Sequence, residues 1–327
     1  MKILVTGASG FIGGEVVRAL LASAPQVRIR ALSRSAGADV RLPGGVEAVR
    51  GDLTTPDRLA EACSDVDVVV HCAGVTRARS IEEFYYVNAE GASHVARAAH
   101  AAGVKRFVLL SSLAARGPDA TPSSGGTASN LGPVEPYGRS KLAGERAVAK
   151  VASDGWSVAL QPGAVYGPGD RELLPLIRLA KRGVAVVPAA THARIQPVYV
   201  SDLAELVVRT ALELPELPFG PWPVAHDQAT PWREVGDLLA VAFHPHTVRT
   251  LALPAIAFEA VAAASELYAL VSGTAPTVDL RRARDLARRS YTTDMTPTRA
   301  ATGWRAKTDL REGIRITVAG YEQRGWL

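Results

Sequence analysis

A glycine-rich turn near the N-terminus constrains the fold more than any other feature of this sequence. The segment VTGASGFIGGEVV follows a short apolar stretch and spaces three glycines three residues apart. In such a turn the first glycine permits a tight bend, the second lets the backbone approach a pyrophosphate, and the third lets the next helix pack close to the strand. The helix N-terminus would offer free N–H groups to the anion. The pattern predicts a nucleotide cofactor bound by Gly7, Ser9, Gly10, Phe11, Ile12 and Gly13.

Short apolar runs alternate with helical patterns through the first third of the chain. Strands are expected at 2–7, 28–34, 46–52, 66–74 and 106–112. Helices are expected at 15–24, 56–64 and 88–103. Strands of continuous apolar character between helices indicate a parallel sheet covered on both faces. The prediction is an α/β fold with a Rossmann-like, doubly wound parallel sheet.

The remainder of the chain is less regular. A Gly-, Pro-, Ser- and Thr-rich segment at 117–136 is typical of a long functional loop. It is followed by the helical motif PYGRSKLAGE (136–145), a strand at 156–163, and helices expected at 172–182, 202–214, 232–242, 254–272 and 308–324. We expect an NAD(P)-binding Rossmann domain over 1–165 and a smaller, mostly helical substrate lobe over 166–327. The chain of that lobe should partly return to the sheet near 195–225.

Composition and charge argue against several classes of protein. Of the 327 residues, 47% are hydrophobic and 21% charged, as in soluble globular proteins. The most apolar stretch (251–273) contains Glu259 and Glu266, and each charge would cost about 2.5–3.5 kcal/mol at a bilayer centre, so no stable membrane insertion is expected. Cys63 and Cys72 match no metal or disulfide pattern, which favours a metal-free protein in the cytoplasm. The net charge of +5 comes with no recognition motif, so no nucleic-acid partner is expected.

The ends of the next strands bear on the choice of nucleotide. The second strand ends in ALSRS, with Arg34 near the place where an acidic residue would favour NAD. Arginine can bind a 2′-phosphate, so NADP(H) is the preferred cofactor and NAD(H) the alternative, although Arg34 could also be a solvated turn residue. Asp52 and Leu53 would lie near the adenine after the third strand. Ala73 and Gly74 would line the cleft after the fourth.

Tyr137 and Lys141 lie four residues apart in PYGRSKLAGE, on one face of the expected helix. A free tyrosine has a pKa near ~10 and is a poor base at neutral pH. A nearby ammonium, together with an oxidised nicotinamide, favours the phenolate, and the lysine could also bind the nicotinamide ribose. In isolation the pair could equally be two surface side chains, so the other motifs of the chain are needed to distinguish a catalytic pair from a surface pair.

The motifs together resemble the extended short-chain dehydrogenase/reductase superfamily, the NAD(P)-dependent epimerase/dehydratase family, over almost the whole chain. They occur in that family's order, as TGASGFIG (6–13), LLSSLAARG (109–117), YGRSK (137–141), QPGAVYGPGD (161–170) and PVYVSDLAEL (197–206). The closing segment TGWRAKTDLREGI (302–314) is similar as well. The resemblance implies an enzyme with a Rossmann fold, a nicotinamide cofactor and a Ser–Tyr–Lys catalytic set. It also implies a homodimer formed through the helices around 88–103 and 137–151.

The resemblance carries catalytic roles onto particular residues. Ser112 fits the catalytic serine position by its spacing from the following glycine, and Ser111 would face the cofactor or the core. Ser112 would hydrogen-bond the substrate oxygen, Tyr137 would give or take its proton, and Lys141 would tune the tyrosine and hold the ribose. Asn88 matches a family position near this network, with a helix N-cap as the alternative. The expected cofactor contacts also include Ser111, Tyr137, Lys141, Pro162 and Val165.

The residues expected around the substrate depart from the sugar-nucleotide members of the family. Those enzymes usually carry an asparagine before the VYGP segment and an arginine after it, where this chain has Ala164 and Gly169. Ile195 occupies a further arginine position, with Arg194 one residue early. A diphosphate needs several cationic donors, so these departures weaken the sugar interpretation. Compensation could come from Arg171, Arg178 or Arg194.

The substrate lobe carries the apolar segment LALPAIAFEAVAAASELYALV (251–271), which is similar to segments in hydroxysteroid-dehydrogenase-like and dihydroflavonol-reductase-like branches. An apolar lid favours an apolar small-molecule substrate, with lobe packing or a dimer contact as equal alternatives. The leading hypothesis is an NADP(H)-dependent ketoreductase or alcohol dehydrogenase acting on a hydrophobic carbonyl or hydroxyl compound. The alternatives are a nucleotide-sugar epimerase or dehydratase and a non-catalytic dinucleotide sensor. The intact Ser112, Tyr137 and Lys141 argue against the sensor.

Overall fold

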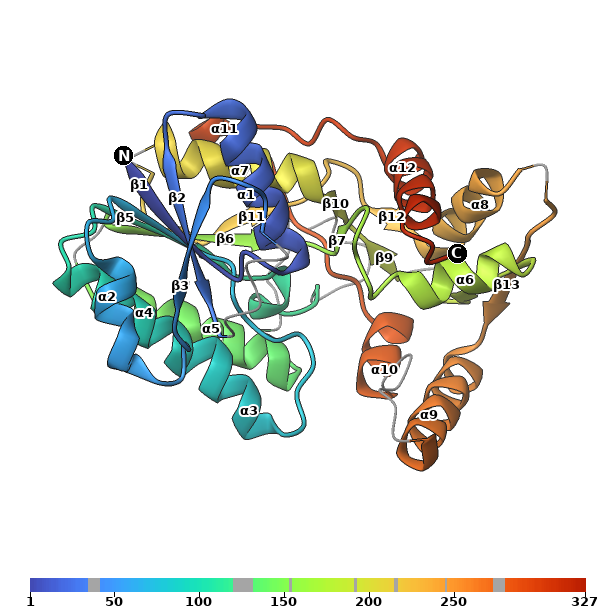
Figure 1. Cartoon of the computed structure of the whole chain (residues 1–327). Coiled ribbons are helices and arrows are strands. Elements are labelled where there is room, and N and C mark those ends of the chain that lie inside the picture. Colours follow the sequence, from blue (N-terminus) through green and yellow to red (C-terminus); the bar gives the residue numbers. More distant parts are fainter. Residues whose placement is uncertain are drawn as a thin grey trace.

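A seven-stranded parallel sheet forms the centre of the computed structural model (Figure 1). The structure describes residues 1–34, 42–119, 132–152, 155–190, 193–214, 217–244, 246–272 and 280–327. Most of the loop expected at 117–136 lies outside these residues. In sheet order the strands are β11 (Trp222–Val224), β6 (Ser157–Pro162), β5 (Arg106–Leu110), β4 (Val68–His71), β1 (Lys2–Thr6), β2 (Arg28–Ser33) and β3 (Val46–Arg50). The predicted Rossmann-like α/β fold is confirmed.

Helices cover both faces of this sheet, as its continuous apolar strands require. On one face lie α1 (Phe11–Ser23) and α7 (Val200–Leu212). The other face is covered by α2 (Leu59–Cys63), α4 (Gly91–Ala101) and α5 (Pro136–Ala149). Successive strand residues point to opposite faces, so each strand contributes to two separate cores.

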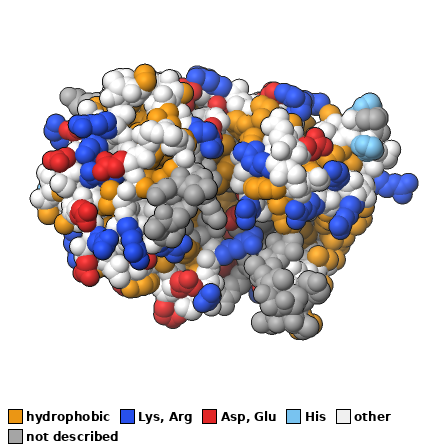
Figure 2. Space-filling model, in the orientation of Figure 1, with side chains coloured by type: hydrophobic (Ala, Val, Ile, Leu, Met, Phe, Trp, Pro, Cys, Tyr) orange, Lys and Arg blue, Asp and Glu red, His pale blue; other side chains and the backbone are white. Residues whose placement is uncertain are grey.

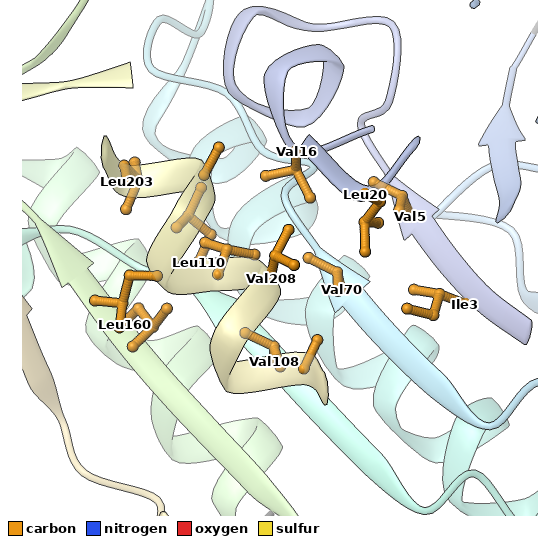
Figure 3. Close-up of a cluster of buried hydrophobic side chains, with 14 of the residues drawn as sticks. Ile3, Val5, Val16, Leu20, Val70, Val108, Leu110, Leu160, Leu203 and Val208 are labelled. Atoms are coloured by element: carbon orange, nitrogen blue, oxygen red, sulfur yellow. The ribbon is translucent and has the colours of Figure 1, made fainter. Parts of the chain in front are cut away.

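The core beneath α1 and α7 shows how the sheet holds its helices (Figure 3). Val16 and Leu20 of α1 and Leu203 of α7 are fully buried against the strands. Burial of each such side chain stabilises the fold by about 1.5–3 kcal/mol. Since α1 begins at Phe11, directly after the glycine-rich turn, this packing also fixes the turn against the end of β1.

The helix expected at 88–103 begins earlier, at Ile81, ends at Ala101 and has three parts. An α-helix, α3 (Ile81–Tyr85), leads into a π-helical turn, η3 (Tyr86–Glu90), which continues as α4. Asn88 therefore lies inside the helix, with helical residues on both sides, and the N-cap interpretation is wrong. Widened π-turns are frequent at functional sites, and this one turns a polar side chain toward the sheet.

The second half of the chain forms a smaller unit around a third apolar core. The helices α6 (Leu174–Lys181), α8 (Trp232–Ala242) and α12 (Leu310–Gln323) pack around the parallel pair β8 (Val184–Pro188) and β13 (Arg249–Leu253). Further short pairs join β7 (Val165–Tyr166) to β10 (Val198–Tyr199) and β9 (Arg194–Ile195) to β12 (Thr230–Pro231). Next to them, α9 (Ala255–Ser272) and α10 (Leu280–Arg288) form a pair of helices that projects from the molecule (Figure 1).

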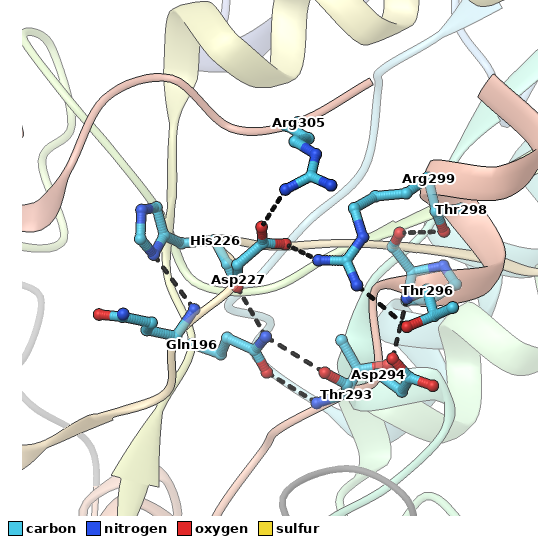
Figure 4. Close-up of polar contacts among 11 residues, drawn as sticks. Gln196, His226, Asp227, Thr293, Asp294, Thr296, Thr298, Arg299 and Arg305 are labelled. Carbon is cyan, nitrogen blue, oxygen red and sulfur yellow. Dashed lines mark hydrogen bonds and ion pairs between the residues drawn. The ribbon is translucent and has the colours of Figure 1, made fainter. Parts of the chain in front are cut away.

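A polar network joins three segments of the second half of the chain: the residues around Gln196, those after β11 and those after α10 (Figure 4). Gln196 donates to the carbonyls of His226 and Thr293 at 2.6 and 3.2 Å and accepts from the Thr293 N–H at 2.7 Å. Asp227 pairs with Arg299 at 2.7 Å, at the helix α11 (Thr296–Thr302). The chain beyond α10 is thereby fastened beside the last strand of the central sheet.

The described residues contain no helix that combines the length and hydrophobicity needed to cross a membrane. Nor do any His, Cys, Asp and Glu side chains within them cluster in a way that could hold a metal ion.

Candidate active site

The glycine-rich turn has the geometry that its sequence predicts. Gly7 has φ +71°, and a Cβ added there would lie 2.8 Å from the Ala73 nitrogen at the end of β4. A Cβ on Gly13 would lie 2.2 Å from the Gly7 carbonyl oxygen, so α1 approaches the strand end as closely as backbone allows. The N–H of Gly10 donates to the same carbonyl at 2.9 Å. Only glycines fit this turn at Gly7 and Gly13 without displacing backbone.

The N-terminus of α1 is open for an anionic ligand. Gly10 is the N-cap residue, and no side chain of the described residues caps this end. The first turn carries no acidic residue that would compete with a phosphate. Ser9 and Gly10 are exposed, whereas Phe11 and Ile12 are half-buried. Free N–H groups, the positive end of the helix dipole and a glycine cradle together fit the pyrophosphate of a dinucleotide.

The ends of β2 and β3 supply the next residues along the same edge of the sheet. Arg34 is exposed directly after β2. Asp52, after β3, accepts hydrogen bonds from the Thr54 N–H at 2.9 Å and hydroxyl at 2.8 Å, and these, aided by the charge of Arg34, lower the pKa of its carboxyl. Leu53 is buried in the core beneath α4. An arginine and an ionised aspartate therefore flank the adenine end of the expected cofactor cleft.

The ends of β1 and β4 are joined by a buried polar contact. The Thr6 hydroxyl lies 2.9 Å from Nδ1 of His71, and it also accepts from the Ala73 N–H at 3.2 Å. Burial lowers the pKa of His71 to about 3, and the positive charge of Lys141 acts in the same direction. The imidazole is therefore neutral at physiological pH and holds the floor of the cleft in place.

Two glycines seat α5 against its neighbours. A Cβ on Gly138 would lie 2.3 Å from the Ala114 carbonyl oxygen, in the short helix η4 (Leu113–Ala115) that follows Ser112. A Cβ on Gly144 would lie 2.4 Å from the carbonyl oxygen of Asn88 in the π-helical turn. The helix that carries the tyrosine and lysine is thus clamped between the loop after β5 and the segment after β4.

The two serines at the end of β5 have different surroundings. Ser112 is half-buried and is the N-cap of η4, where its hydroxyl accepts from the Ala114 N–H at 3.1 Å. Ser111 is 5% exposed and donates to the buried carboxylate of Glu145. Ser111 therefore faces the core, and Ser112 keeps a hydroxyl at the edge of the sheet, next to the start of α5.

Tyr137 occupies the first turn of α5 and is half-buried. Its ring meets Phe84 edge to face, with centroids 6.1 Å apart. Its backbone carbonyl accepts from the Ser140 hydroxyl at 2.7 Å. Contacts from α3 and from within α5 therefore hold the ring and its backbone at the same end of the cleft as Ser112.

Lys141 lies one turn further along α5 and is 8% exposed. Its ammonium donates to the Leu110 carbonyl at 2.6 Å, and a Cβ added at Gly74 would lie 3.8 Å from its Nζ. Burial lowers the pKa of Lys141 to about 8, and the nearby carboxylate of Glu145 acts against this shift. The amino group lies between the ends of β4 and β5, at the carboxyl edge of the sheet where this fold binds dinucleotides.

Asn88 connects the loop after β4 to α5. Its carboxamide accepts from the Val75 N–H at 2.8 Å and donates to the Val75 carbonyl and the Ser140 hydroxyl, both at 3.0 Å. The loop after β4 is thereby tied to α5, and Gly74 is held close to Lys141. Asn88 is a positioning residue of the cleft.

Glu145 is the buried charged residue that sequence reasoning left without a role. It is 3% exposed, and it accepts from the Ser111 hydroxyl and, at 2.8 Å, from the Gln161 amide. Burial raises the pKa of its carboxyl, while these hydrogen bonds and Lys141 oppose the rise. Its position four residues after Lys141, on the same helix face, is a signal that could have found it.

The last expected cofactor contacts, Pro162 and Val165, lie at the end of β6 and in β7. Pro162 is buried and pairs with Val224, whereas Val165 is half-buried in β7. A Cβ on Gly169 would come 3.7 Å from the Phe11 ring, so this segment reaches the glycine-rich turn. The structure therefore brings the ends of β1, β4, β5 and β6 together at one edge of the sheet, next to the start of α5.

Comparison with known proteins agrees with this arrangement. Residues 3–217 match the NAD dependent epimerase/dehydratase family. The chain is 36% identical over 335 aligned positions to a ceramide reductase of Caulobacter vibrioides, covering 99% of this chain and 96% of that protein. It is 26% identical to a UDP-glucose 4-epimerase of Vibrio cholerae, covering 98% and 96%. The structure of MoeE5 in complex with UDP-glucose and NAD matches with a TM-score of 0.75 at 25% identity, over 99% of both chains.

The family match extends over well more than half of the chain, and the ceramide reductase is similar from end to end. The predicted family is therefore confirmed, and with it the prediction of an enzyme. The chain belongs to the NAD dependent epimerase/dehydratase family and is an NAD(P)-dependent oxidoreductase of the extended short-chain dehydrogenase/reductase type.

Proposed function

We propose that this enzyme is an NADP(H)-dependent ketoreductase or alcohol dehydrogenase whose substrate is a hydrophobic, lipid-like carbonyl or hydroxyl compound. The observation that supports the proposal is the seating of α5, which packs Gly138 against the helix that follows Ser112 and holds the Lys141 ammonium on the Leu110 carbonyl at the end of β5. End-to-end similarity to a ceramide reductase supports a lipid-like substrate.

Each side chain has a distinct task in the proposed reaction. Ser112 hydrogen-bonds the substrate oxygen, and Tyr137 gives that oxygen its proton during reduction or takes it during oxidation. The Lys141 ammonium favours the phenolate form of the tyrosine and holds the nicotinamide ribose. The bound nicotinamide supplies the hydride chemistry. Glu145 stays away from the substrate and keeps Ser111 and the base of α5 in position.

A preference for NADP(H) is supported by the exposed Arg34 after β2, since a guanidinium can bind a 2′-phosphate. Hydrogen bonds to a charged group contribute about 1.5–3 kcal/mol, so Arg34→Ala should raise the KM for NADPH roughly tenfold or more and leave the KM for NADH nearly unchanged. Steady-state kinetics with both nucleotides measure this. Equal effects on the two cofactors would contradict a phosphate contact.

A nucleotide-sugar substrate is the second candidate, favoured by the similarity to a UDP-glucose 4-epimerase. The local chemistry weighs against it. Gly169 has φ +109°, a conformation that an arginine would adopt only with strain. Arg171 stacks over the Trp326 ring at 5.2 Å, and Arg178 donates to the Trp326 carbonyl at 2.9 Å, so both are engaged at the end of the chain.

The test is a substrate panel in which NADPH consumption is followed by absorbance. It contains long-chain ketones, N-acyl keto amines and steroid ketones, with UDP- and dTDP-sugars as the second arm. We expect turnover with the long-chain ketones and none with the sugars. Epimerisation or dehydration of a sugar nucleotide, with no reduction of any ketone, would overturn the proposal.

We also propose a homodimer formed through α4 and α5. The outer surface of these helices has a hollow of about 960 Å³, in which the cationic residues Arg97, Arg139, Arg146 and Lys150 surround the apolar Ala101, Leu142, Ala143, Ala147 and Val151. Such small and apolar side chains allow close approach of partner helices. Light scattering should give twice the chain mass, and a monomer at micromolar concentration would contradict this assembly.

A further inference from the structure

The helix α9 presents an apolar face to the outside of the molecule. Ile256, Val261 and Leu267 are 78%, 58% and 64% exposed. The other exposed positions described on this helix are alanines, at 260, 263 and 264. A surface helix of a globular protein normally turns its apolar face inward, so this arrangement is reversed.

The charged residues of α9 lie along the side of the helix that contacts α10. Glu259, 13% exposed, pairs with Arg284 at 3.2 Å and with Arg288 at 2.6 Å. Glu266 accepts from the Leu280 N–H at 2.8 Å. The helix therefore uses its carboxylates to hold its neighbour and leaves its aliphatic side chains outward.

The apolar surface continues beyond the helix. Leu251, in β13, is 48% exposed, and Ala252 beside it is exposed as well. Figure 2 shows hydrophobic side chains gathered along the edge of the molecule where β13 runs into α9. We call β13 and the outward residues of α9 the apolar patch. Contiguous exposed patches of this kind mark sites of protein or membrane interaction.

Cationic side chains border the apolar patch. Arg249 is exposed at the start of β13, and Arg284 and Arg288 of α10 have side chains 57% and 52% exposed. These two arginines share the single carboxylate of Glu259, so α10 keeps a net positive charge at the patch. Aliphatic side chains bordered by arginines are typical of segments that lie in the interface of an anionic membrane.

The patch is connected to the catalytic cleft through α10. Directly after α10, Arg289 lies 3.8 Å from Glu135, the N-cap residue of the helix that carries Tyr137. Thr292 then donates to Asp119 from its N–H at 3.1 Å and its hydroxyl at 2.6 Å, in the segment that follows Ser112. A binding partner at the apolar patch would therefore lie close to the start of α5 and to the segment after Ser112.

We propose that β13, α9 and α10 form a peripheral docking surface for a membrane containing anionic lipid. This deepens the proposed function and rests on it in one respect, since a lipid-like substrate would be taken up from that membrane. A second copy of the chain is a poorer occupant, because a two-fold contact on this small patch would bring the bordering arginines of both copies together.

The experiment is flotation of the purified full chain with vesicles of phosphatidylcholine alone or mixed with phosphatidylglycerol. We expect the chain to float with the anionic vesicles, and high salt to release most of it. The double variant Ile256→Glu with Leu267→Glu should lose at least roughly tenfold in apparent affinity, because two aliphatic anchors are removed. Arg284→Gln with Arg288→Gln should lose about fivefold for each charge.

The matched control is Ile81→Glu, since Ile81 is 44% exposed at the start of α3, in the half of the chain that forms the central sheet. It should bind vesicles like the wild type, and all variants should keep the wild-type melting temperature. The proposal is overturned if the wild type stays unbound with anionic vesicles at low salt, or if the patch variants bind as well as the control. It is also overturned if the patch variants turn a dimer into a monomer and leave vesicle binding unchanged. Flotation needs no turnover, so a chain that binds vesicles but reduces no ketone contradicts the proposed function alone.

Discussion

The helices α5 and α9 pack in opposite ways. Backbone lies so close to α5 that a methyl group on Gly138 or Gly144 would overlap a carbonyl oxygen. In contrast, α9 packs on α10 and β13 and turns aliphatic side chains outward. Tight backbone contacts accept few residue types, and so they leave a recognisable motif. An outward apolar face accepts many, so composition is its only mark in the sequence.

The largest expected effect comes from removing one oxygen atom from α5, the tightly packed helix. Tyr137→Phe keeps the ring and its contact with Phe84 but removes the group proposed to transfer the proton. General acid–base catalysis contributes about 10²–10⁴-fold, so kcat should fall by that factor. Fluorescence titration should show unchanged binding of NADPH.

The control is Tyr86→Phe, which removes the exposed hydroxyl that donates to the Thr54 carbonyl at 3.2 Å. Its kcat should match the wild type. Full activity of the Tyr137 variant would remove the proposed role of this residue.

A second change acts beneath the same helix. Glu145→Ala would leave the Ser111 hydroxyl and the Gln161 amide buried without their acceptor, and each such loss costs about 1–3 kcal/mol. Urea denaturation should show a free energy of unfolding lower by about 2–6 kcal/mol. Glu145→Gln keeps an acceptor oxygen and should recover most of it. Equal losses of unfolding free energy in the two variants would show that these hydrogen bonds do not account for the lost stability.

Glu145 also shows where sequence reasoning stops. The sheet was predictable because buried parallel strands are continuous apolar runs, and the first expected strand at 2–7 appears as Lys2–Thr6. The motif order also predicts that Ser112, Tyr137 and Lys141 act at one site. The burial of Glu145 in α5 depends on Ser111, directly after β5, and on Gln161, in β6. Only tertiary packing brings these three residues together.

The outward face of α9 was unpredictable for a related reason. The apolar run at 251–271 was compatible with a substrate lid, lobe packing or a dimer contact. Which side of the helix faces outward depends on the pairing of Glu259 with Arg284 and Arg288, some 25 residues further along the chain. Periodicity within the helix gives no indication of this partner.

A third change tests the close packing of α5 directly. Gly138→Ala places a methyl group 2.3 Å from the Ala114 carbonyl oxygen, so the helix or η4 must shift. Overpacking of this kind costs about 1–3 kcal/mol, and thermal unfolding would record it. Gly44→Ala is the matched control, because no atom of the described residues lies within 4 Å of its added Cβ. Similar melting temperatures for the two variants would contradict the close contact.

The last prediction concerns how the charge of Lys141 affects stability as the pH changes. Its pKa falls from 10.5 in the unfolded chain to about 8 in the fold, so between these values the unfolded chain holds a proton that the folded chain has released. The contribution of this group to stability therefore increases as the pH rises from about 8 to 10.5, by at most about 1.4 kcal/mol per pH unit.

Lys141→Met removes this titration and keeps a buried side chain of similar length. The difference in unfolding free energy between wild type and variant, measured by urea denaturation at several pH values, should be constant below about pH 8. Above that pH the wild type should gain stability relative to the variant. A difference that stays flat across the whole window would mean that Lys141 keeps its ordinary pKa in the fold. The tight contacts around α5 would then hold an ammonium that remains fully charged, and burial would not be what sets its electrostatics.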